Sequence, residues 1–169
     1  MTAPLLVFGW GNPSRGDDAL GPLCIERLRG LGLSAERVEY LEDFQLQVEH
    51  ALDLQGRERV LLVDASLSCT APFEVTGLHG ARDASLGSHA LSPAALLQVY
   101  SELRGEAPPP CTLLAIRGER FELGQPPSAL ALANLDAALQ WAMAWLQGSE
   151  AFAVSTPYCA ALHTGCASS

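Results

Sequence analysis

The feature that most constrains the fold is a fully apolar segment that ends in a glycine turn and leads into a helical pattern. Residues 4–8 (Pro-Leu-Leu-Val-Phe) show no alternation of polar and apolar side chains, which is typical of a strand buried on both faces. Gly9 and Gly11 allow the backbone to leave such a strand sharply. Residues 19–31 then carry apolar side chains at helical spacing. The segment therefore predicts a strand, a loop and a helix.

Strands and helices continue to alternate along the chain. We predict further strands at 38–41, 59–65, 73–78 and 111–117, and helices at 93–104 and 128–146. Residues 44–49 lead into a further helical segment, which fades near Leu54. Ser92 and Pro93 are a typical N-cap and first helical residue. This order predicts an α/β fold with three layers, in which a mostly parallel twisted sheet is flanked by helices on both faces. We assign residues 1–147 to this single domain and 148–169 to a flexible tail.

Composition excludes several classes of protein. A chain of 169 residues with 49% hydrophobic and 17% charged residues is not disordered and fits one domain with a substantial core. Its net charge of −9 disfavours binding to nucleic acid or anionic lipid. No segment has the length of a membrane span, and no Lys or Arg precedes the first strand. We therefore expect a cytoplasmic monomer without nucleic-acid or membrane partners.

The cysteines do not resemble a disulfide framework, because there are five of them and they are widely spread. Cys24 falls in the first predicted helix and Cys111 at the start of a predicted strand, so we expect both to be packing residues. Near the C-terminus, Cys159, His163 and Cys166 are residue types that bind metals. At a chain end rich in Ser and Ala, such residues more often belong to a disordered tail.

The glycine turn also admits a dinucleotide-binding interpretation, which two observations disfavour. Ser14 stands at the third position of the glycine fingerprint. Asp17 and Asp18 place negative charge at the helix start, where a pyrophosphate would have to bind. The acidic helix start favours a cation instead.

Two aspartates at predicted strand ends are candidate ligands. Asp17 is a natural N-cap for the first helix, and since one cap needs only one aspartate, Asp18 is the better ligand candidate. Asp64 ends a buried strand, where an unpaired carboxylate is costly to desolvate. The alternative for Asp64 is a turn closed through Ser66 or Ser68.

The third candidate ligand is a histidine. His89 lies in a loop just before a predicted helix, and a histidine considered alone is more often a surface residue. Together with Asp18 and Asp64 it makes a set of three ligands, two carboxylate oxygens and one imidazole nitrogen. Such a set suits a divalent metal such as nickel and leaves coordination positions open for substrate or water. His79 is the fallback. The absence of Gly-x-Ser-x-Gly and His-Glu-x-x-His motifs disfavours serine hydrolases and ordinary zinc peptidases.

These residues resemble the hydrogenase maturation endopeptidases, which remove the C-terminal extension of nickel-iron hydrogenase large subunits. Residues 9–12 (Gly-Trp-Gly-Asn) with Asp17, Asp18 and Gly21 are similar to the N-terminal signature of that family. Val63-Asp64-Ala65 resembles its strand-end aspartate, and Ser88-His89 resembles its histidine ligand. Asp43 is similar to the family's supporting aspartate, although the glycines usual in that turn are missing here.

The resemblance implies an activity and a partner. It assigns Asp18, Asp64 and His89 as metal ligands and catalytic residues, with Asn12, Asp17 and Asp43 in supporting roles. It further implies that nickel arrives with the hydrogenase large-subunit precursor, bound by the precursor's own cysteines, and serves both recognition and catalysis. The alternative is a non-catalytic chaperone or adaptor that binds an immature metalloprotein through the same site.

Overall fold

The computed structural model describes residues 1–80 and 91–148. The described residues form a five-stranded sheet with the order β2-β1-β3-β5-β4. Its strands are β1 (Leu5–Trp10), β2 (Val38–Asp43), β3 (Arg59–Ser66), β4 (Phe73–Gly77) and β5 (Cys111–Arg117). β4 pairs with β5 in antiparallel fashion, whereas the other three pairings are parallel. The predicted mostly parallel sheet is therefore confirmed.

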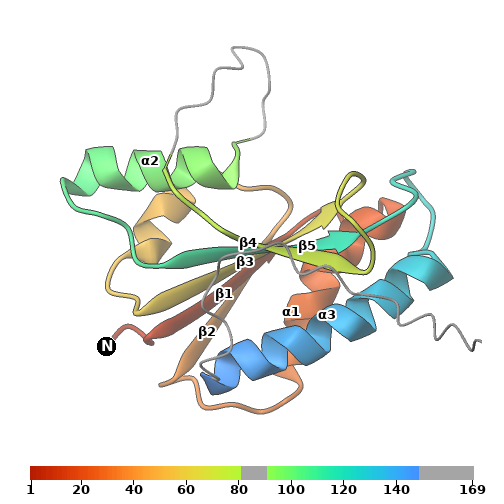
Figure 1. Cartoon of the computed structure of the whole chain (residues 1–169), viewed down its shortest axis with the longest axis horizontal. Coiled ribbons are helices and arrows are strands. Elements are labelled where there is room, and N and C mark those ends of the chain that lie inside the picture. The colour runs from red at the N-terminus through yellow and green to blue at the C-terminus, as the bar shows by residue number, and fades with distance from the viewer. Residues whose placement is uncertain (81–90, 149–169) are drawn as a thin grey trace, which may run out of the picture.

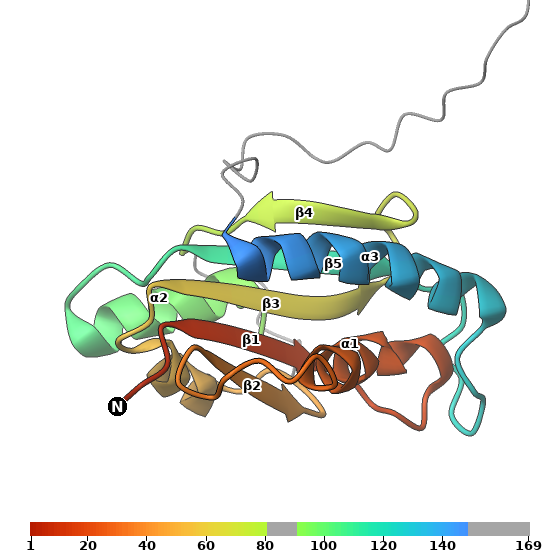
Figure 2. The same ribbon diagram turned by 90° about the horizontal axis from the view of Figure 1, so that it is seen from below.

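Helices cover both faces of this sheet. Helices α1 (Leu20–Arg29) and α3 (Ala129–Gln147) lie on one face, and α2 (Pro93–Arg104) lies on the other (Figures 1 and 2). Two short 3₁₀ helices complete the described elements, η1 (Gly16–Ala19) before α1 and η2 (Val48–Leu54) on the α2 side. Each face has its own apolar core. The predicted three-layer α/β architecture is thus observed.

Strand β1 lies in the middle of both cores, as its sequence predicts. It pairs with β2 on one side and β3 on the other, and helices cover its two faces, so all six of its residues are buried. Cys24 and Cys111 are buried free thiols, and burial raises the pKa of each to about 12. Both therefore act as small apolar packing residues, which confirms the prediction.

The helical segment predicted to fade near Leu54 is present as a short 3₁₀ helix. Residues 44–47 are not helical, and the helical turns between β2 and β3 are the 3₁₀ helix η2, which begins at Val48. The strand before it is longer than predicted and continues to Asp43, because β2 pairs with β1 over its whole length, up to Trp10 opposite Asp43. The segment 44–47 therefore leaves the sheet beside the end of β1.

The parallel strands place their carboxyl ends at one edge of the sheet. Asn12 follows the end of β1, Asp43 ends β2, and Asp64 lies two residues before the end of β3. Asp18 lies in η1, in the connection from β1 to α1. Sites in open α/β sheets form at this edge.

Candidate active site

The glycine loop brings the end of β1 into backbone contact with the start of α1. Gly11 has a φ of 148°, and a Cβ atom there would lie 1.9 Å from the Asp18 carbonyl oxygen. A Cβ on Gly21 would lie 2.3 Å from the Trp10 carbonyl oxygen. No side chain fits at either position, so these glycines serve close approach as well as turning. The approach places Asp18 next to the end of the strand.

Asp18 is held by the loop that it faces. The backbone N–H of Asn12 donates to Asp18 Oδ2 over 2.9 Å. Oδ1 of the Asn12 side chain accepts from the Ser14 N–H (2.9 Å), and the backbone carbonyl of Asn12 accepts from the Arg15 N–H (3.0 Å). Asn12 therefore holds Asp18 through its backbone N–H and orders the loop with its side chain. Its supporting role in the reaction stays a prediction.

Asp17 has a different role from the predicted one. It is fully buried, and no side-chain cap bond is made at the start of η1 or α1. Its carboxylate accepts from the backbone N–H groups of Glu119 (2.7 Å), Arg120 (3.0 Å) and Ser128 (2.6 Å), and from the Ser128 hydroxyl (2.9 Å). Asp17 thus ties the loop after β5, and the N-cap of α3, to the glycine loop. The prediction that it caps its own helix is wrong.

The charge of Asp17 is stabilised in this buried place. Burial alone would raise the pKa of its carboxyl, but the hydrogen bonds from Ser128, Glu119 and Arg120 bring the pKa below the ordinary value. Asp17 is also absent from the residues that line the pocket described next. It therefore serves as a structural anchor beside the site and, unlike Asp18, does not line the pocket.

Asp64 lies two residues before the end of β3, which continues to Ser66, and its electrostatic environment is unusual. Burial, and then the negative charge of Asp18, raise the pKa of Asp64 to about 7, although hydrogen bonds from the Ala65 N–H and the Trp10 side chain oppose the rise. The turn after β3 is closed by Ser66, whose hydroxyl accepts from the N–H groups of Ser68 (3.2 Å) and Cys69 (3.0 Å). Ser66, and not Asp64, is the turn residue.

Asp18 and Asp64 line one pocket of about 380 Å³ at the carboxyl ends of β1 and β3. Its other polar lining residues include Asn12 and Arg15, and the Arg15 guanidinium donates from Nε to the Phe121 carbonyl (3.3 Å). Apolar walls come from Trp10, Phe44, Leu46, Leu91 and Phe121. The structure therefore brings together the two carboxylates that the sequence singled out, in a concave and partly apolar site.

The histidine candidates do not complete the site within the described residues. His89 lies outside that part of the chain, as do Cys159, His163 and Cys166. His79, the fallback, is exposed and does not line the pocket. Within residues 1–80 and 91–148, no three His, Cys, Asp or Glu side chains cluster closely enough to hold a metal ion. The assignment of Asp18, Asp64 and His89 as metal ligands therefore stays a prediction.

The chain is similar to a known protein over most of its length. No protein-family model matches the chain. The hydrogenase 2 maturation protease of Escherichia coli strain K12 is 29% identical over 157 residues, which cover 89% of this chain and 94% of that protein. The predicted resemblance to the hydrogenase maturation endopeptidases is confirmed.

Solved structures of maturation proteases share the fold. The endopeptidase HybD from Escherichia coli aligns with a TM-score of 0.70 at 24% identity, over 86% of this chain and 93% of that one. The maturation protease HycI from Thermococcus kodakarensis KOD1 aligns with a TM-score of 0.67 at 22% identity, with the same two coverages. In the part of the chain that the structure describes, no helix has the length and apolar character needed to cross a membrane.

Two residues near the site were not predicted from the sequence. Trp10 has the character of a core residue, yet its side chain hydrogen-bonds Asp64. His50 falls in a predicted helical stretch, yet its Nε2 lies 3.2 Å from Oδ2 of Asp43. One sequence signal could have identified Trp10 as a residue near the site: it ends its strand opposite Asp43, with which it pairs in register. His50 has no such signal, because its role depends on how the chain turns after β2.

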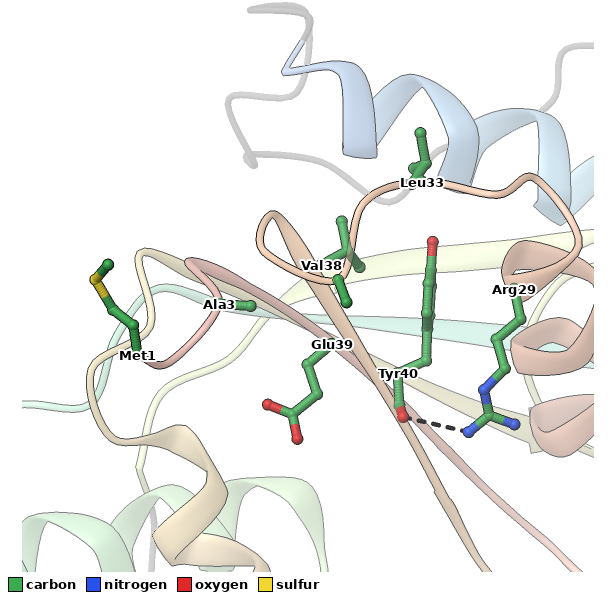
Figure 3. Close-up of a pocket in the computed structure, with 8 residues that line it drawn as sticks. Met1, Ala3, Arg29, Leu33, Val38, Glu39 and Tyr40 are labelled. Carbon is green, nitrogen blue, oxygen red and sulfur yellow. Dashed lines mark hydrogen bonds between the residues drawn. The ribbon is translucent and has the colours of Figure 1, made fainter.

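A second pocket, of about 460 Å³, lies beside the edge strand β2 and the start of the chain. Figure 3 shows its lining, in which Arg29 donates from Nη2 to the Tyr40 carbonyl over 3.2 Å. Its charged side chains are Arg29 and Glu39, and none of the predicted site residues lines it. The volume of a pocket therefore does not identify the site. Of these two pockets, the smaller one carries the paired carboxylates of Asp18 and Asp64.

The raised pKa of Asp64 predicts a pH effect on stability. A carboxyl group whose pKa is raised from 3.8 to about 7 by folding stabilises the folded state fully below about pH 4, and this contribution is lost as the pH rises through 7. Asp64→Asn removes that dependence. The quantity to compare is the free energy of unfolding of the variant minus that of wild type, measured without added metal. This difference should be about 1–3 kcal/mol larger at about pH 8 than at about pH 5, because only wild type loses the contribution of Asp64. Urea unfolding at the two pH values measures it, and an unchanged difference would contradict it.

Proposed function

We propose that this chain is an endopeptidase that removes the C-terminal extension of a nickel-loaded [NiFe]-hydrogenase large-subunit precursor. The observation that supports it best is that Asp18 of η1 and Asp64 of β3, which are 46 positions apart in the sequence, line one pocket. The chain that carries this pocket is 29% identical to a hydrogenase 2 maturation protease.

The electrostatics of the pocket suit a cation brought by the substrate. Asp18 and Asp64 are close enough for the charge of one to raise the pKa of the other. A divalent ion placed between them would offset this repulsion, and carboxylates with an imidazole are acceptable ligands for nickel. His89 is our candidate for the imidazole. It precedes the pocket-lining residue Leu91 by two positions in the sequence.

In this proposal the nickel of the precursor provides both recognition and catalysis. A docked divalent ion polarises the scissile carbonyl or lowers the pKa of a bound water, so no nucleophilic side chain is needed. The protein's own residues hold the ion and the peptide. Asp18 is oriented by the Asn12 N–H, Asp64 is oriented by Trp10, and the apolar walls exclude water from the bound segment.

A cleavage assay with and without nickel tests the proposal. Purified protein is mixed with precursor that was prepared either nickel-loaded or nickel-free, and the products are weighed by mass spectrometry. We expect the loss of a C-terminal peptide only from the loaded precursor. Equal cleavage of both precursors would contradict the role of nickel, and a stable uncut complex would instead support the adaptor.

A further inference from the structure

The side chains of Asp43 and His50 connect the two ends of the segment that forms one wall of the pocket. His50 Nε2 lies 3.2 Å from Asp43 Oδ2. Phe44, Gln45 and Leu46, which line the pocket, lie between these two residues in the chain. We call this pair, with the segment that it spans, the 43–50 clamp.

The hydrogen bonds of the clamp determine which nitrogen of His50 carries the proton. The backbone N–H of Gln47 donates to His50 Nδ1 over 2.8 Å, so Nδ1 is an acceptor. In a neutral imidazole the proton is then on Nε2, which donates to the Asp43 carboxylate. The other oxygen of Asp43, Oδ1, accepts from the Phe44 N–H over 2.6 Å. Each oxygen of Asp43 and each ring nitrogen of His50 therefore makes a hydrogen bond.

The clamp is anchored to the core of the protein. The His50 ring packs on the ring of Phe8 with 4.5 Å between centroids, and its side chain is only 14% exposed. Phe8 also contacts Trp10, at 5.6 Å between ring centroids, and Trp10 hydrogen-bonds Asp64. Position 50 is thus connected through β1 to the pocket-lining end of the same strand.

The segment that the clamp spans needs such support. Residues 44–47 belong to no helix or strand. Leu46 is buried, but Phe44 is 65% exposed and its N–H is held by Asp43. A wall that is ordered before the partner arrives lowers the entropic cost of binding.

We propose that His50 is a positioning residue, which holds Asp43 and thereby orders residues 44–46 as a preformed wall for the bound precursor. The proposal rests on the proposed function for the identity of the bound molecule. In this arrangement Asp43 acts through its hydrogen bonds and not as a group that touches the reacting atoms.

Two substitutions at position 50 separate the two bonds of the imidazole. In His50→Asn the short amide keeps an acceptor for the Gln47 N–H but does not reach Asp43. In His50→Gln the longer amide keeps a donor for Asp43. We expect His50→Asn to raise the KM for nickel-loaded precursor about tenfold or more with kcat changed less than about threefold, and His50→Gln to remain within about threefold of wild type. Equal KM values for His50→Asn and wild type would overturn the proposal.

A double variant separates the clamp from a direct role of the Asp43 carboxylate. In Asp43→Asn two donors, the Phe44 N–H and His50 Nε2–H, compete for one amide oxygen, so the clamp is broken. Adding His50→Gln restores it, because the amide introduced at position 43 then donates to the amide oxygen introduced at position 50. We expect Asp43→Asn to lose about tenfold in kcat/KM and the double variant to recover most of that loss. A double variant no better than Asp43→Asn would show that the carboxylate itself is required.

Hydrogen exchange tests the clamp without any substrate. The amides of residues 44–46 should exchange about tenfold faster in His50→Asn than in wild type or His50→Gln. If wild type does not cleave precursor at all, the proposed function fails while this measurement still decides the clamp. If wild type cleaves and the exchange rates are equal in all three proteins, the clamp fails alone.

Discussion

Replacing Asp18 by alanine is expected to abolish processing of nickel-loaded precursor while the protein stays folded. Asp18 lines the pocket and is held by one described donor, the Asn12 N–H, so its removal leaves little unpaired. It supplies one of only three proposed ligands from the protein. Because the loss of a group that merely hydrogen-bonds to a metal ligand costs about 10–100-fold, we expect a loss of more than about 100-fold here. Mass spectrometry of the product over time measures the rate.

A matched substitution shows whether the charge is the cause. Asp18→Asn has the same shape and keeps an acceptor for the Asn12 N–H, but it has no negative charge. It should be as inactive as Asp18→Ala, with an unfolding transition close to that of wild type. Asp64→Ala and His89→Ala are expected to abolish processing in the same way. Processing by any of these variants within about tenfold of wild type would contradict the three-ligand scheme.

The largest effect on stability is expected at the adjacent residue. Asp17→Ala leaves three backbone N–H groups and the Ser128 hydroxyl without their acceptor in the interior of the protein. Removal of one partner from a buried charged network costs about 3–5 kcal/mol. Urea unfolding at neutral pH should show a loss of this size in the free energy of unfolding.

A surface aspartate provides the control for Asp17. Asp136 pairs with Arg27 over 2.7 Å, and the side chains of both residues are largely exposed. Asp136→Ala should therefore cost less than about 1 kcal/mol. If Asp17→Ala were no more destabilising than Asp136→Ala, the anchoring role of Asp17 would be wrong. Since folding lowers the pKa of Asp17, its stabilising contribution is present above the unfolded pKa and is lost as the pH falls.

The effects of Asp17 and Asp18 differ although the residues are neighbours in sequence. Asp17 is expected to affect stability, because its four bonds hold the loop after β5 to the glycine loop. Asp18 is expected to affect activity, because its side chain lines the pocket. A pair of measurements on each variant, one of unfolding and one of processing, should separate the two roles.

Local sequence is sufficient for the elements whose signals are local. The unbroken apolar run of β1, the Ser92 cap of α2, whose hydroxyl accepts from the Ala95 N–H over 3.1 Å, and the long apolar helix α3 all lie where the sequence predicts them. Each depends on residues within a few positions of one another. The carboxylates at strand ends follow from the same patterns, because parallel strands place their carboxyl ends at one edge.

Long-range contacts account for the remaining features. The partners of Asp17 lie 102 to 111 positions away in the sequence, so no local pattern distinguishes it from a helix cap. The bond between His50 and Asp43 depends on how residues 44–47 turn after β2, which no local pattern determines. The amino-acid order was enough to establish the α/β layers and to put Asp18 and Asp64 near strand ends. Which aspartate lines the pocket and which is buried is settled in three dimensions, because packing of the loop after β5 surrounds one carboxylate and leaves the other exposed to the pocket.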